Sequence, residues 1–110
     1  MAFHKKDIFE KKEQELALFS KAFSHPARIA ILKVLAQKGE CSCSAIVEQL
    51  PLAQSTVSQH LKELVEAGLV EGTTDGPRSC YCINWKAFDK YNREVNGLFD
   101  RLQRKREKLK

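Results

Sequence analysis

Prolines and glycines divide the middle of this sequence into three helical segments, and this spacing constrains the fold more than any other feature. The first segment starts at Pro26, because proline suits the first turn of a helix, and Ser24 or His25 can cap it. Gly39 ends the segment. The side chains that we expect it to bury are Ile29, Ile31, Leu32 and Leu35.

The other two segments are separated by Pro51. Residues 42–50 form a short helix that must stop there, because proline lacks an amide hydrogen and disfavours helical geometry in the preceding residue. A longer helix covers residues 54–67, and Gly68 ends it. Its apolar residues share one face: Val57, Leu61, Leu64 and Val65. A short helix, a tight turn and an amphipathic helix predict a helix-turn-helix over residues 43–67.

The polar face of the third helix predicts contact with DNA. The N-terminal residues of such a helix enter the major groove, and the acidic Glu63 and Glu66 lie at its other end. An ordinary solvated face is the alternative interpretation. The residues that we expect to contact DNA, one of them in the following hairpin, are Gln54, Ser55, Thr56, Ser58, Gln59, His60, Lys62 and Arg78.

A β-hairpin is expected directly after this helix. Strand-like runs at residues 69–73 and 79–84 flank four turn-forming residues at 74–77. The hairpin, residues 69–84, would form a wing whose tip brings Arg78 to the phosphate backbone. A plain surface hairpin is the alternative.

The two terminal regions carry apolar stripes at helical spacing. Residues 7–22 form the first helix, whose stripe comprises Ile8, Leu16, Phe19 and Phe23. Residues 86–107 form the last, whose stripe comprises Phe88, Tyr91, Val95, Leu98 and Leu102. These stripes could cover the chain's own core. In a chain of 110 residues, we expect instead that both helices form a homodimer interface, so that two recognition helices read an inverted-repeat operator.

The expected fold is a single winged helix-turn-helix domain over residues 1–110, mainly α with a small β-hairpin. The formal charge of +5 permits a polyanionic partner such as double-stranded DNA. No apolar run approaches the roughly 20 residues needed to cross a bilayer, and residues 1–15 lack a secretion signal, so we expect a cytoplasmic protein that binds no membrane. No residue spacing indicates an enzyme, and a protein-interaction module is the rival function.

Three stretches resemble the ArsR/SmtB winged-helix repressors: FSHPARIAILKVLAQKGECSCSAIV, PLAQSTVSQHLKELVEAGLV and DGPRSCYCIN. The likeness covers residues 19–85. It implies a homodimeric repressor that leaves its operator when an inducer, often a metal ion or metalloid, binds. Arsenic sensors of the family carry a cysteine pair like Cys41 and Cys43, with a third cysteine where this chain has Ile46. Zinc sensors of the family often use histidine and carboxylate ligands on the last helix, and residues 86–110 contain no histidine, so we do not expect that site here.

Cys41 and Cys43 are the candidate metal ligands. Soft thiolates suit arsenite, antimonite or another soft metal ion, and a helix N-terminus lowers the pKa of a thiol. Residues two apart in a helix point to nearly opposite sides, so joint binding requires that one of them precede the helix. Two other interpretations remain open, namely reversible oxidation and small residues that bind nothing. Cys80 and Cys82 should share one face of a strand, and a four-cysteine zinc site is a weaker possibility.

Overall fold

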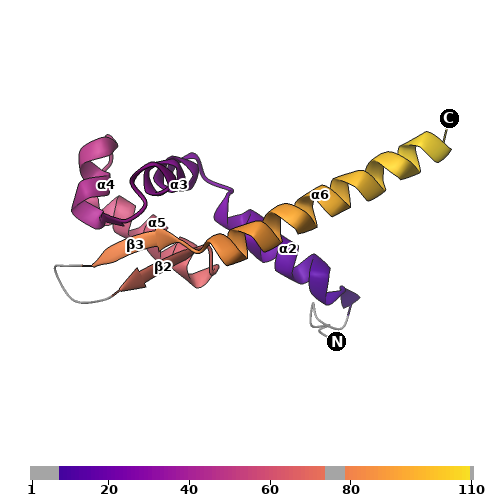
Figure 1. The fold of residues 1–110 in the computed structure, drawn as a ribbon, viewed down its shortest axis with the longest axis horizontal. Coiled ribbons are helices and arrows are strands. Elements are labelled where there is room, and N and C mark those ends of the chain that lie inside the picture. Colours follow the sequence, from indigo (N-terminus) through magenta and orange to yellow (C-terminus); the bar gives the residue numbers. More distant parts are fainter. Residues whose placement is uncertain (1–7, 74–78, 110) are drawn as a thin grey trace.

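The computed structural model describes residues 8–73 and 79–109 as a body of helices and a small sheet from which one long helix projects (Figure 1). The elements in chain order are α2 (Lys11–Ala22), α3 (Pro26–Lys38), β1 (Cys41–Ser42), α4 (Cys43–Gln49), α5 (Gln54–Glu66), β2 (Val70–Thr73), β3 (Cys80–Ile83) and α6 (Trp85–Lys108). The prediction of a mainly helical fold with a small hairpin is confirmed.

The helix ends lie where the local sequence favours them. His25 caps α3, because its Nδ1 atom accepts a hydrogen bond of 3.0 Å from the amide of Ala27. Gly39 ends the same helix at a φ of 83°, and Gly68 follows α5 at the same angle. Ser42 caps α4 by accepting a hydrogen bond from the amide of Ala45. These local signals confirm the predicted helix-turn-helix.

The hydrophobic core lies among α3, α4, α5 and the sheet. Its fully buried large side chains are Ile31, Leu35, Ile46, Val57, Leu61, Leu64, Leu69 and Val70. Burying each such side chain stabilises the fold by about 1.5 to 3 kcal/mol.

Two predicted core residues lie outside that core. Ile29 is 44% exposed, because it is two residues from the buried Ile31 and points to nearly the opposite side of α3. Val65 is 39% exposed, whereas His60, on the other edge of the apolar face of α5, is buried. The buried face of α5 is therefore turned toward His60.

The N-terminal helix is shorter than predicted. It begins at Lys11, because Glu10 and Glu13 form a capping box in which the Glu10 amide donates to the Glu13 carboxylate. Ile8 precedes this helix and is 58% exposed, so the prediction that it joins the apolar stripe is wrong. Residue 7 lies outside the described residues.

The sheet contains a strand that the sequence did not predict. Its order is β1-β3-β2 and both pairings are antiparallel, with Cys41 opposite Tyr81 and Ser42 opposite Cys80. The wing strands β2 and β3 lie within one residue of their predicted bounds. Residues 74–78, and with them Arg78, lie outside the described residues. Because β1 pairs with β3, the residues just before α4 are hydrogen-bonded to the wing.

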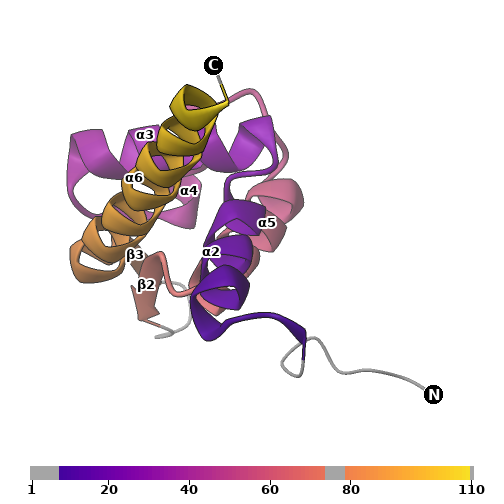
Figure 2. The same cartoon turned by 90° about the vertical axis from the view of Figure 1, so that its right-hand side faces the viewer.

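The first half of α6 packs against α2, and its second half extends beyond the rest of the molecule (Figures 1 and 2). The Tyr91 ring stacks on Phe23 with centroids 5.0 Å apart and meets Phe19 edge-on at 5.7 Å. Farther along, Phe99 and Leu102 are 57% and 56% exposed. The stripe on α6 therefore covers the body only in part. Among the described residues, no helix combines the length and apolar character that crossing a bilayer requires.

Candidate nucleic-acid interface and cysteine sites

The polar face of α5 is open to solvent. Its exposed side chains are Gln54, Ser55, Thr56, Ser58, Gln59 and Lys62. The other face is held by burial of Val57, Leu61 and Leu64 against neighbouring elements, chiefly α3 and α4. Seven of the eight residues predicted to contact DNA lie on α5, and six of these seven are exposed; the seventh is His60.

The N-terminus of α5 is suited to bind an anion. Its capping residue, Ala53, has no side chain that accepts a hydrogen bond, and the first turn carries no acidic residue. The first amide hydrogens of a helix lack helical partners, and the helix dipole places positive charge there. A phosphate oxygen can accept these hydrogen bonds, and Lys62 supplies a cation two turns farther along.

His60 faces the protein interior. Its Nδ1 atom accepts a hydrogen bond of 3.2 Å from Arg28 Nε, and the ring of His25 lies 4.4 Å away. Arg28 also donates to the carbonyl of Lys21, 3.0 Å away. The hydrogen bond between His60 and Arg28 therefore links α5 to the start of α3, and the second hydrogen bond of Arg28 links α3 to the end of α2. This burial does not fit the predicted role of His60 in touching DNA, and we assign it to positioning α5. Sequence spacing gave no signal for a pairing 32 residues apart.

Burial lowers the pKa of His60, and the neighbouring His25 and Arg28 lower it further. The unfolded chain therefore binds a proton more readily than the folded one, so this group's contribution to stability is present above about pH 6.5 and is lost as the pH falls below it. We expect the wild type to lose more stability than His60→Gln between about pH 7.5 and 5.5. Urea unfolding at both pH values measures this difference, and equal losses would contradict it.

The cysteine pair is divided between a strand and a helix. Cys41 lies in β1 and is 6% exposed, and burial raises the pKa of its thiol. The expectation that a helix N-terminus lowers the pKa does not hold for Cys41, because this residue sits in the sheet. Cys43 begins α4, and its Sγ atom lies 3.4 Å from Ser58 Oγ on α5. One cysteine thus precedes the helix, as joint binding of an ion requires.

Cys80 and Cys82 lie on the opposite face of the sheet from Cys41. Tyr81 pairs directly with Cys41 and shares its face of the sheet, whereas Cys80 and Cys82 alternate with Tyr81 and occupy the opposite face. This register does not fit the four-cysteine zinc site. Among the described residues, no three or more histidine, cysteine or acidic side chains are grouped to hold a metal.

Comparisons with known proteins agree with this architecture. Residues 23–73 match the family model of a helix-turn-helix domain. The chain is 37% identical over 93 residues to an uncharacterized HTH-type transcriptional regulator of Methanocaldococcus jannaschii, covering 84% of this chain and 99% of the relative. It is 32% identical over 94 residues to the arsenical resistance operon repressor of Bacillus subtilis, covering 86% and 79%. A solved ArsR-like transcriptional regulator from Rhodococcus sp. RHA1 matches with a TM-score of 0.78 at 25% identity, covering 91% and 93%.

The fold, the exposed helix α5 and these relatives define a winged helix-turn-helix regulator of transcription, which binds DNA and is not an enzyme. Within that class, the chain belongs to the ArsR/SmtB family of transcriptional repressors.

Proposed function

We propose that this repressor acts as a homodimer on an inverted-repeat operator, and that a thiophilic metal ion or metalloid bound by Cys41 and Cys43 releases it. DNA recognition is supported chiefly by the exposed polar face of α5, whose N-terminus has no capping side chain. Ser55, Thr56 and Gln59 present hydroxyl and amide groups there, which recognise base edges and phosphates.

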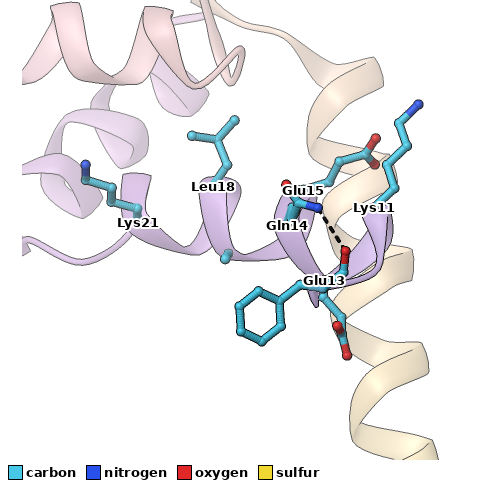
Figure 3. A pocket seen from close by; sticks show the side chains of 8 residues that line it. Lys11, Glu13, Gln14, Glu15, Leu18 and Lys21 are labelled. Carbon is cyan, nitrogen blue, oxygen red and sulfur yellow. Dashed lines mark hydrogen bonds between the residues drawn. The ribbon is translucent and has the colours of Figure 1, made fainter. Parts of the chain in front are cut away.

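The second copy is proposed to cover the apolar side chains that the terminal helices leave exposed. Leu18 on α2 is 53% exposed, and Phe99 and Leu102 on α6 are more so. Leu18 also lines a hollow of about 860 Å³, and its lining side chains, most of them labelled in Figure 3, come from α2 and from Phe9 just before it. A two-fold axis relates the two α5 helices of such a dimer, and successive major grooves on one side of DNA lie about 34 Å apart, so the dimer would read an inverted repeat with half-sites one helical turn apart.

Selection from random duplexes tests the DNA-reading part. We expect enrichment of an inverted repeat and an affinity that falls steeply with salt concentration, because bound phosphates release counterions. Failure to enrich any sequence, or binding that does not respond to salt, would favour the rival role as a protein-interaction module.

The contact between Cys43 and Ser58 supports coupling between an inducer and α5. The thiol lies 3.4 Å from a hydroxyl on the proposed recognition helix, so an ion that takes the thiolate changes this contact directly. The similarity to the Bacillus subtilis arsenical resistance operon repressor favours arsenite or antimonite as the inducer. A redox-responsive or uninduced regulator remains the alternative.

Replacing Cys41 and Cys43 with serine is expected to leave DNA binding intact and to abolish release by arsenite. A coupling of about 1 to 3 kcal/mol would weaken the operator complex of the wild type roughly 5- to 150-fold, whereas the variant would show no change. Fluorescence anisotropy with labelled operator measures both. The matched control, Cys80→Ser with Cys82→Ser, should respond like the wild type. If the Cys41 and Cys43 variant still responds, its inducer binds elsewhere.

A further inference from the structure

Cys80 and Cys82 form a pair of thiols on the outer face of the wing. They are half-buried and alternate along β3 with Tyr81 and Ile83, of which Ile83 is 6% exposed and belongs to the core. A Cβ atom added to Gly72 would lie 2.7 Å from the Tyr81 ring, which therefore lies across β2 on the side away from both thiols.

The strand spacing excludes a disulfide between these thiols but suits a metal bridge. Residues two apart on a strand lie about 6.6 Å from each other, whereas a disulfide needs Cβ atoms about 3.5 to 4.5 Å apart. Two thiolates on opposite sides of one ion, with metal–sulfur bonds close to the roughly 2.3 Å of zinc–thiolate sites, are about 4.6 Å apart. Each sulfur reaches that separation by leaning about 1 Å toward the other.

The surroundings of the pair limit what it can hold. Neighbours on the same face are the hydroxyl residues Ser42 and Thr73, which pair with Cys80, and Glu71, which pairs with Cys82. No group of three or more histidine, cysteine or acidic ligands occurs among the described residues, so this site offers two soft ligands. Two soft sulfur ligands select Cu(I) over ions that need four ligands or harder ones.

Binding one monovalent ion replaces the protons of both thiols, so two protons pass to the solvent for each ion bound.

We propose that Cys80 and Cys82 bind a soft monovalent metal ion, Cu(I) or its analogue Ag(I), on the outer face of the wing. This site is separate from Cys41 and Cys43 and does not depend on the proposed release mechanism.

Anaerobic titration of the full chain with Cu(I), against a chromogenic Cu(I) chelator, tests the proposal. The background variant is Cys41→Ser with Cys43→Ser, so that only the wing thiols remain. We expect one equivalent of Cu(I) in this variant, and at least a 100-fold loss of affinity when Cys80 and Cys82 are also changed to serine. Absence of Cu(I) binding in the background variant would overturn the proposal, as would binding that survives in the four-serine protein.

Two controls distinguish loss of the thiols from loss of the fold. Circular dichroism of each variant establishes that it is folded, and alanine in place of serine at both wing positions provides a second pair of variants.

Discussion

Changing Gln59 to glutamate is expected to weaken operator binding at least 100-fold. The side chain is exposed in the middle of the polar face of α5, so the change removes an amide that can pair with a base edge. That loss costs about 1 to 3 kcal/mol, and the new carboxylate also repels the phosphates by several kcal/mol. Fluorescence anisotropy at one fixed salt concentration measures the difference.

The matched control is Gln37→Glu, which makes the same chemical change at an exposed position of α3. We expect it to alter operator affinity far less. A second variant, Gln59→Ala, should lose about 1 to 3 kcal/mol and relax preference at one base pair. If Gln59→Glu and Gln37→Glu weaken binding equally, net charge rather than the α5 face determines the affinity.

Replacing Phe99 and Leu102 with glutamate is expected to convert the protein to a monomer. Both side chains are more than half exposed in the single chain, so the fold does not depend on them. Covering the exposed half of these two side chains in both copies would contribute about 3 to 7 kcal/mol to association, since full burial of one such side chain contributes about 1.5 to 3 kcal/mol. The introduced carboxylates would also be buried without partners, so the dimer dissociation constant should rise at least 1000-fold, which sedimentation velocity detects.

Gln103→Glu is the control for this pair, because it adds a carboxylate at an exposed polar position of the same helix. The monomeric variant should also bind a full operator far more weakly than the wild type, since one α5 helix then contacts each half-site independently. A variant that remains dimeric would place the interface away from the outer half of α6.

Local signals were sufficient to predict the helix-turn-helix. Proline at the start of α3, glycine at its end and Pro51 before α5 act through backbone geometry that neighbouring residues alone determine. The exposed face of α5 was predictable in the same way, because a 3.6-residue period assigns most residues to one side or the other. His60 and Val65 lie at the margins of that face, where the period alone does not decide which is buried.

Contacts between distant residues could not be predicted in this way. Strand β1 has only two residues and exists because β3 pairs with it, so nothing in residues 41 and 42 signals a strand. That pairing puts Cys41 in the core, where burial raises the pKa of its thiol. It also places Cys80 and Cys82 on the opposite face of the sheet from Cys41. The hydrogen bond from Arg28 to His60 likewise depends on how α3 packs against α5.

Backbone preferences and apolar periodicity act over a few residues, so the positions of the helices and wing strands and most of the solvent-facing side chains of α5 were evident from the sequence alone. The placement of Cys41 on one face of the sheet, of Cys80 and Cys82 on the other, and of His60 on the buried side of α5 could be read only from the folded chain. Those outcomes depend on strand register and helix packing between segments tens of residues apart, which no local pattern encodes.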